Sequence, residues 1–128
     1  MNQELLNAYN IIFGHLKRKG PGSDETTKEA ISCLPELPSS PDILDLGCGA
    51  GAQTFILAGH FSGQIVAVDI SDVFLNELRS NAIKLGLGDR ITTLNASMDA
   101  LPFADKSFDL IWCEGAIFTV GFTAGLKH

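Results

Sequence analysis

The sequence predicts an α/β fold in which a parallel sheet carries helices on both faces. Short apolar runs alternate with segments of helical periodicity, an arrangement typical of strand-helix-strand units. The first apolar run, residues 43–46, leads directly into glycines at alternate positions within 47–51. Such a turn joins the first strand and helix of nucleotide-binding α/β folds, where side chains would block the approach of a ligand to the backbone.

Two helices are expected before this first strand. Apolar residues from Gln3 to Lys19 follow the spacing of an amphipathic helix, which we expect to cover the sheet. A second helix begins with Ser23 or Asp24 as its N-cap and continues to about Leu34. The proline-containing segment 35–41 is a connector within one domain, because it is too short to separate two cores.

The elements after the glycine loop follow at the spacing of repeated strand-helix units. Each is bounded by turn residues, and a glycine at position 86 ends the longer of the two helices. We expect helices over residues 52–58 and 72–85, and strands over residues 64–69, 90–94 and 108–113.

Asp45 places a carboxylate just before the first glycine of the loop. Gly47, Gly49 and Ala52 satisfy the loose dinucleotide pattern G-x-G-x-x-G/A, but a purely structural turn satisfies it too. A carboxylate here would oppose a pyrophosphate at the helix N-terminus and would attract a cation instead. S-adenosylmethionine meets that requirement, because it has no phosphate and carries an ammonium and a sulfonium group. Alternatively, Asp45 is a structural acid bonded to backbone amides of the loop.

A second acid, Asp69, ends the next expected strand. It lies about 20 residues beyond the glycines, the spacing at which an acid hydrogen-bonds the hydroxyls of an adenosine ribose. Alternatively, Asp69 belongs to a helix N-cap region together with Ser71 and Asp72, although a cap does not require this distance from the glycines.

Four segments in this order resemble the motifs of class I S-adenosylmethionine-dependent methyltransferases. They read ILDLGCGAG, VAVDIS, LPF and FDLI, and they start at residues 43, 66, 101 and 108. The similarity is strongest to the small-molecule group called methyltransferase type 11, and it covers residues 40–120. The resemblance implies a Rossmann-like sheet, S-adenosylmethionine as the cofactor and methyl transfer to a small-molecule acceptor.

The resemblance also implies cofactor-binding positions along the carboxyl edge of the sheet. In such enzymes the methionine part contacts the glycine loop, the ribose contacts the acid after the second strand, and the adenine contacts the loop after the third strand. The matching residues are Asp45, Gly47 and Gly49 for the first, Asp69 with Ile70 for the second, and Ser97 with Met98 for the third. An Asp is commoner at the position of Ser97, so its hydroxyl or its neighbours would have to accept the adenine contact.

Two further residues are assigned through the resemblance. Glu114 follows the fourth strand, where it would orient the cofactor or act catalytically by accepting a proton from the acceptor. Its alternative is an N-cap or first-turn acid for the next helix. The segment 18–22 resembles one that folds over the cofactor, so Arg18 would meet the cofactor carboxylate; the alternative is a solvated surface Arg.

Methyl transfer mainly requires the alignment of two reactants, so a catalytic base is optional. We expect no metal, because His15, His60 and His128 are scattered and no Cys or His pair shows ligand spacing. The Asn-Pro-Pro-Tyr type of motif is absent, which weighs against DNA or glutamine as the acceptor. Two other functions stay open: a non-catalytic S-adenosylmethionine-binding module, and an NAD-dependent oxidoreductase, which Asp45 opposes.

Composition agrees with a soluble protein of the cytoplasm. The three cysteines are scattered, which favours a reducing compartment over a disulfide framework. A net charge of −6 without a basic stripe disfavours nucleic acid as a partner. Neither a signal peptide nor a membrane span is expected from the sequence.

The resemblance finally suggests that the chain is the N-terminal half of a longer enzyme. Class I methyltransferases build a seven-stranded sheet, and this sequence supplies only its first four strands. We therefore expect one incomplete domain over residues 1–128, with a helical cover over 1–34 and a cofactor-binding α/β half over 41–128. An uncovered edge at the fourth strand would then allow self-association.

Overall fold

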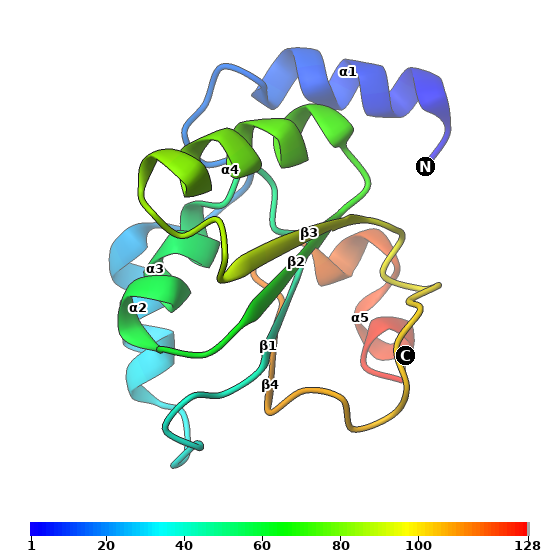
Figure 1. Cartoon of the computed structure of the whole chain (residues 1–128). Helices are drawn as coiled ribbons and strands as arrows, with labels where there is room; N and C mark the ends of the chain where they lie inside the picture. Colours follow the sequence, from blue (N-terminus) through cyan, green and yellow to red (C-terminus); the bar gives the residue numbers. More distant parts are fainter. Residues whose placement is uncertain (128) are drawn as a thin grey trace.

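The computed structural model describes residues 1–127 and contains a four-stranded parallel sheet (Figure 1). Its strands stand in the order β3-β2-β1-β4, and Ile43 of β1 pairs with Ile65 of β2 on one side and Leu110 of β4 on the other. This confirms the predicted α/β class, and the parallel arrangement brings all four carboxyl ends to one edge. The strands are β1 (Ile43–Leu46), β2 (Ile65–Asp69), β3 (Ile91–Asn95) and β4 (Leu110–Trp112).

Three helices pack together on one face of this sheet. They are α2 (Asp24–Ser32), α3 (Ala52–His60) and α4 (Asp72–Lys84), and they bury Ile31, Leu57 and Leu75 in a common core with the strands. The sequence predicted helices on both faces of the sheet, and this face carries the long ones. On the other side, Figure 1 shows the loop after β3 with the short η1 (Ile117–Thr119) and α5 (Phe122–Gly125). Ile111 of β4 stays 62% exposed.

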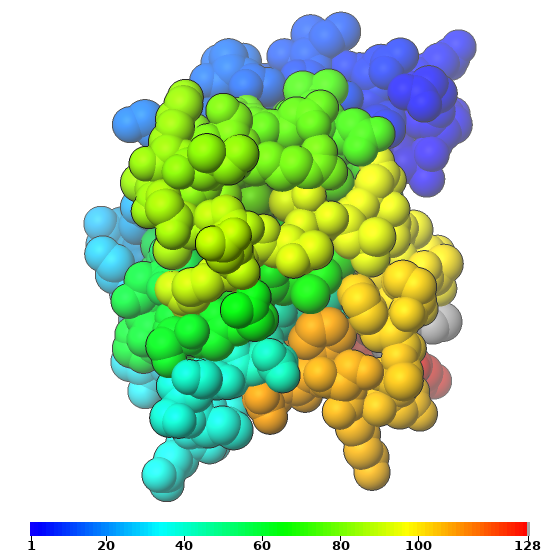
Figure 2. Space-filling model, viewed as in Figure 1, coloured from blue at the N-terminus to red at the C-terminus, as the bar shows by residue number. Residues whose placement is uncertain are grey.

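The N-terminal helix α1 (Gln3–Phe13) lies above α4, and Figure 2 shows the blue N-terminal segment seated on the α4 side chains. The prediction of a helix up to Lys19 is wrong at its end. Gly14 caps α1, and the Lys19 ammonium donates to the carbonyls of Gly14 and Leu16, which turns this segment back across the molecule. Sequence periodicity cannot detect such a turn, because it depends on where the ammonium is buried.

Most other boundaries agree with the sequence. Ser23 is the N-cap of α2 in a capping box, and Gly86 follows α4 with a φ of +71°. The fourth strand is shorter than predicted, because the Asp109 backbone and side chain both bond to the backbone of Asp42 before β4 begins. Within the described residues 1–127, no helix combines the length and apolar character needed to cross a membrane.

Candidate functional site

A cavity of about 550 Å³ lies at the carboxyl edge of the sheet, between α1 and the loops that follow the four strands. The prediction of a site at this edge therefore coincides with an actual cavity. Among the residues that the sequence singled out, all except Asp45 line it: Arg18, Gly47, Gly49, Asp69, Ile70, Ser97, Met98 and Glu114.

The glycines of the loop are required both by backbone geometry and by close packing. Gly47, Gly49 and Gly51 have φ values of +68°, +54° and +97°, which disfavour any other residue. A side chain at Gly47 would also collide with Ala116, and a Cβ at Gly49 would lie 3.2 Å from the Lys19 Cβ. The segments after β4 and after α1 thus pack directly on the loop.

The backbone amides of this loop are mostly used within the protein. The Gly47 and Cys48 N–H groups donate to the carbonyl of Val68 over 2.8 and 3.0 Å. The Gly49 N–H donates to Asp69 Oδ2 over 2.9 Å, and the Gly51 N–H donates to the carbonyl of Cys48. These groups are therefore not free to cradle a phosphate, as the amides of a dinucleotide loop do.

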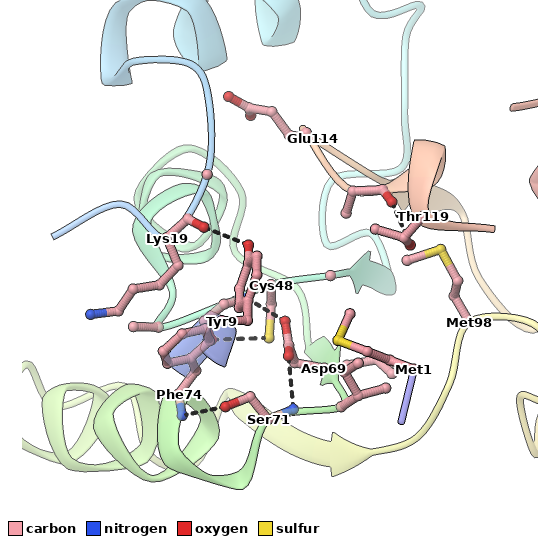
Figure 3. Close-up of a pocket in the computed structure, with 18 of the residues that line it drawn as sticks. Met1, Tyr9, Lys19, Cys48, Asp69, Ser71, Phe74, Met98, Glu114 and Thr119 are labelled. Carbon is pink, nitrogen blue, oxygen red and sulfur yellow. Dashed lines mark hydrogen bonds between the residues drawn. The ribbon is translucent and has the colours of Figure 1, made fainter. Parts of the chain in front are cut away.

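Asp69 lies in the cavity at the end of β2, beside Tyr9 and Cys48 (Figure 3). Its Oδ2 accepts from Gly49 N–H, its Oδ1 accepts from Ser71 N–H over 2.9 Å, and no ion pair within residues 1–127 neutralises it. Burial raises the pKa of this carboxyl, and the backbone bonds offset part of that shift. Each oxygen keeps capacity to accept a further hydrogen bond. The N-cap of α4 is Ser71 rather than Asp69.

Asp45 is fully buried below the cavity wall rather than exposed in it. Its Oδ2 accepts from Thr54 Oγ1 over 2.6 Å and its Oδ1 from Gln53 Nε2 over 3.3 Å. Its partners are therefore side chains of α3, and not the loop amides that the structural alternative supposed. Burial raises the pKa of this carboxyl to about 7, against the effect of these two hydrogen bonds. Asp45 reaches the cavity only through Gln53, which does line it.

Glu114 and Arg18 are bonded to each other. Glu114 Oε1 accepts from Arg18 Nη1 over 3.1 Å, and Oε2 accepts from Trp112 Nε1 over 3.1 Å. The Thr27 hydroxyl lies 2.8 Å from both oxygens and shares its one hydrogen between them. Arg18 also bonds Asp24, so it is not a solvated surface residue, and its guanidinium already pairs with two carboxylates of the chain. Figure 3 shows Glu114 directed away from Asp69. Both residues line the cavity wall, but their charged groups hold the chain together.

The loop after β3 brings Ser97 and Met98 to the cavity, as the sequence predicted, and Ile70 joins them from the end of β2. Met98 extends across the cavity, since a Cβ at Gly47 would lie 3.6 Å from its Cε. Thr119, from the segment after β4, lines the same cavity (Figure 3). This side of the cavity is therefore lined by a flexible apolar side chain, with Ser97 and Asp99 on either side of it in the chain.

Four residues at or next to the site were not predicted: Tyr9, Lys19, Thr27 and Gln53. The Tyr9 hydroxyl donates to the carbonyl of Lys19 over 2.7 Å, and the Lys19 ammonium pairs with Glu77. Of these, only Gln53 carried a sequence signal, as a polar residue in the first turn after the glycine loop. Tyr9, Lys19 and Thr27 contact residues that are ten or more positions away in the sequence, so no local pattern indicates these contacts.

The sequence profile of a family described as a methyltransferase domain matches residues 43–125. The chain belongs to this family. The resemblance that the motifs indicated is thereby confirmed, and the matched range begins with β1 and includes every strand of the methyltransferase sheet described above.

Relatives agree with this assignment of the methyltransferase domain. Dimethylglycine N-methyltransferase of Parasynechococcus marenigrum is 33% identical over 77% of this chain and 35% of that enzyme. The solved structure of an S-adenosylmethionine-dependent methyltransferase from Geobacter sulfurreducens, in complex with S-adenosyl-L-homocysteine, matches with a TM-score of 0.77 and 21% identity, over 94% of this chain and 50% of that one. The YjhP structure from E. coli has a TM-score of 0.78 and 23% identity, over 93% and 48%. The chain thus spans half or less of the length of each relative.

Proposed function

We propose that this methyltransferase domain binds S-adenosylmethionine and serves the transfer of its methyl group to a small-molecule acceptor. The observation that carries the proposal is Asp69, a carboxylate in the cavity whose two oxygens are oriented by backbone N–H groups and have no cationic partner in residues 1–127. An acceptor of this kind at the end of the second strand suits the paired hydroxyls of a ribose.

The residues of the cavity fit this cofactor. A volume of about 550 Å³ lies within the usual range of about 300–1,000 Å³ for small-molecule sites. The strand order gives a direction: Met98 after β3 faces the adenine side, Asp69 after β2 the ribose, and Gly47 after β1 the amino-acid end. The acceptor side then lies near Glu114, after β4.

When bound, S-adenosylmethionine supplies a methyl group on a positively charged sulfur. As the methyl group is transferred, its bond to sulfur breaks and the sulfur becomes a neutral thioether. The chain's own contribution is alignment and the exclusion of water. Asp69 holds the ribose. Helix α1 and the Arg18–Glu114 ion pair form the part of the cavity wall that shields the cofactor from water. Because three donors, Arg18, Thr27 and Trp112, already bond the Glu114 carboxylate, we assign it to this closure, and it would act as a base only after releasing Arg18.

A small-molecule acceptor is favoured by the relative named for dimethylglycine. The net charge of −6 disfavours nucleic acid as a partner, and three free cysteines agree with a cytoplasmic location. We also propose that β4, which pairs only with β1 in the described chain, offers its free edge to a second copy.

One alternative has an observation in its favour. A non-catalytic S-adenosylmethionine-binding module would explain why Glu114 is fully engaged, and the presence or absence of transferase activity would distinguish it. A dinucleotide oxidoreductase is disfavoured because the N–H groups of Gly47, Cys48, Gly49 and Gly51 bond within the protein, so the loop itself offers few donors to a pyrophosphate.

Calorimetric titration of the folded chain with S-adenosylmethionine, S-adenosylhomocysteine and NAD tests the proposal. We expect the first two to bind with a dissociation constant of about 1 μM, or about −8 kcal/mol, and NAD not to bind. Circular dichroism before titration establishes that the chain is folded. A folded chain that bound NAD and neither adenosyl-sulfur ligand would refute the assignment.

A further inference from the structure

We propose that Gln53 accepts a hydrogen bond from the ammonium group of the cofactor's amino-acid end, and that Asp45 fixes the orientation of the Gln53 amide for this purpose. The inference rests on the proposed function, because it assigns a contact to a cofactor of that class. It gives Asp45 a positioning role in place of the direct contact that the sequence suggested.

Gln53 combines burial with access to the cavity. It is the second residue of α3, its exposed fraction is only 4%, and it lines the cavity next to Gly47. A buried glutamine is costly unless its amide is hydrogen-bonded, so its partners define what the side chain does there.

The orientation of the amide follows from the partners of its nitrogen. Gln53 Nε2 lies 3.3 Å from Asp45 Oδ1 and 3.4 Å from the carbonyl oxygen of Gly47. The Gly47 carbonyl can only accept, and so can the Asp45 carboxylate when it is ionised, so the NH2 group must face them. The amide oxygen must then point the other way.

That oxygen is available to a ligand. Gln53 Oε1 accepts no hydrogen bond from the described part of the chain. In that part, every side-chain oxygen or nitrogen that is shielded from solvent has a hydrogen-bond partner. Since Oε1 has no partner, it cannot be one of the shielded atoms, so it is exposed, and the cavity that Gln53 lines is where it is exposed. The site therefore presents a bare acceptor above Gly47, on a side chain whose other atoms are held.

The position selects the ammonium group over the other donors of the cofactor. β1 stands between β2 and β4 in the sheet, so the group next to Gly47 lies between the ribose at Asp69 and the acceptor side at Glu114. Along the cofactor, that group is the amino-acid end. A carbonyl oxygen backed by a carboxylate suits a cationic donor, because hydrogen bonds from charged donors are the stronger ones.

The first turn of α3 fits the other charge of the same end. The helix has nine residues, and its N-cap, Gly51, makes no side-chain cap hydrogen bond. The first N–H groups of the helix can therefore donate to an anionic neighbour of the ammonium group, such as the cofactor carboxylate. Gln53 and the start of α3 together match a zwitterion rather than an isolated cation.

The test compares two ligands on one variant. Q53M keeps the size of the side chain but removes its acceptor, and calorimetry measures binding of S-adenosylhomocysteine and of 5′-methylthioadenosine, which lacks the amino-acid end. We expect Q53M to weaken S-adenosylhomocysteine about tenfold and to leave 5′-methylthioadenosine within about twofold. The matched control Q64M, at an exposed glutamine just before β2, should change neither.

Other outcomes separate this inference from the proposed function. Equal losses for both ligands, or no loss for either, would overturn the role of Gln53 while the cofactor assignment stood. Wild-type protein that bound neither ligand would overturn the proposed function itself. If Q53M does not fold, wild type is titrated with an S-adenosylhomocysteine analogue that lacks the amino group: binding about tenfold weaker than that of S-adenosylhomocysteine supports the inference, and equal binding overturns it.

Asp45 is tested as a positioning residue in the same assay. D45N leaves an oxygen for the Gln53 amide but removes the negative charge behind it. We expect S-adenosylhomocysteine binding to weaken about threefold, less than in Q53M, with 5′-methylthioadenosine unchanged. A loss in D45N larger than in Q53M would show that Asp45 contacts the ligand directly and would overturn this order of roles.

Discussion

At the scale of single residues, the carboxylates of Asp45, Asp69 and Glu114 differ by their partners. Asp45 bonds an amide and a hydroxyl, Asp69 bonds two backbone N–H groups, and Glu114 bonds a guanidinium. Of these three, only Asp69 combines a place in the cavity wall with spare acceptor capacity and no ion pair within residues 1–127. The chemistry of each acid is thus set by its surroundings and not by its type.

The role of Asp69 predicts the effect of D69N on cofactor binding. The substitution replaces one acceptor oxygen by a donor, so one ribose hydroxyl loses its charge-assisted bond. We expect affinity for S-adenosylhomocysteine to fall by about 1.5–3 kcal/mol, measured by calorimetry. D89N, at an exposed aspartate before β3, is the control and should bind like wild type. Unchanged affinity in D69N would remove Asp69 from the cofactor site.

Asp45 predicts a pH dependence of stability. Its carboxyl has an ordinary pKa of 3.8 and a folded-state pKa of about 7, so the folded chain retains a proton that the unfolded chain has lost between these values. This group therefore stabilises the fold most at low pH, and that stability is lost as the pH rises through about 7. From pH 5 to pH 8 the loss is about 2.5 kcal/mol.

Urea unfolding of wild type and D45N at both pH values measures this term. The variant cannot titrate at this position. The unfolding free energy of wild type minus that of D45N should therefore fall by that amount from pH 5 to pH 8. Parallel pH profiles for the two proteins would contradict the raised pKa.

At the scale of elements, the segment between α1 and α2 is held by a buried lysine. The Lys19 ammonium donates to two backbone carbonyls, pairs with Glu77 at 3.0 Å and lies 5.3 Å from the centre of the Phe74 ring. Figure 3 shows this ammonium directed away from Asp69. Its aliphatic part meanwhile packs over Gly49, so one side chain fixes the segment to α4 and to the glycine loop together.

K19M should therefore release this segment. The variant keeps the apolar part but removes every bond of the ammonium, so local opening becomes easier while the core is unchanged. We expect cleavage by trypsin after Arg18 to accelerate about tenfold, followed by mass spectrometry. The control is K17M, which replaces an exposed neighbour and should leave cleavage after Arg18 unchanged. Equal rates in wild type and K19M would show that other contacts hold the segment.

Arg18 connects the same segment to the end of β4, and it offers an internal comparison. Its pairs with Glu114 and with Asp24 have the same N–O distance of 3.1 Å, but the Glu114 side chain is 18% exposed and the Asp24 side chain 64%. Solvent screens the second pair far more. Double-mutant cycles with R18M, E114Q and D24N should give a coupling of about 1 kcal/mol for Arg18–Glu114 and about 0.3 kcal/mol for Arg18–Asp24. Equal couplings would mean that exposure does not decide their strength.

At the scale of the whole molecule, the sequence predicted what local pattern controls. The glycine loop, the strand-end position of Asp69 and the helix N-cap at Ser23 or Asp24 each depend on neighbours in the chain, and each was found at its expected place, with Ser23 as the cap. The sequence predicted the strand of Asp45 correctly, but it predicted a side chain at the mouth of the loop, whereas the structure buries that side chain behind the cavity wall. The direction of a side chain at a strand end depends on the helix that packs against it, here through Thr54.

The missed features depend on pairs of residues that are far apart in the chain. Thr27 bonds Glu114, and Lys19 pairs with Glu77, so neither role exists before α2, α4 and β4 are assembled. For the same reason the apolar periodicity up to Leu16 predicted too long a first helix. Burial of one ammonium among backbone carbonyls outweighed a continuing amphipathic pattern.

The open side of the sheet predicts self-association of the chain. In residues 1–127, β4 pairs only with β1, and Ile111 on this strand is 62% exposed, so free backbone groups and an apolar side chain lie together at the edge. A charge at this place should oppose pairing with a second copy, and it should change stability by no more than about 0.5 kcal/mol because the position is exposed. Sedimentation velocity over a range of concentrations should therefore show less association for I111K than for wild type. I83K adds the same charge at a 73% exposed isoleucine on α4, away from this edge, and should associate like wild type. Equal suppression by both variants would mean that net charge, and not the β4 edge, controls association.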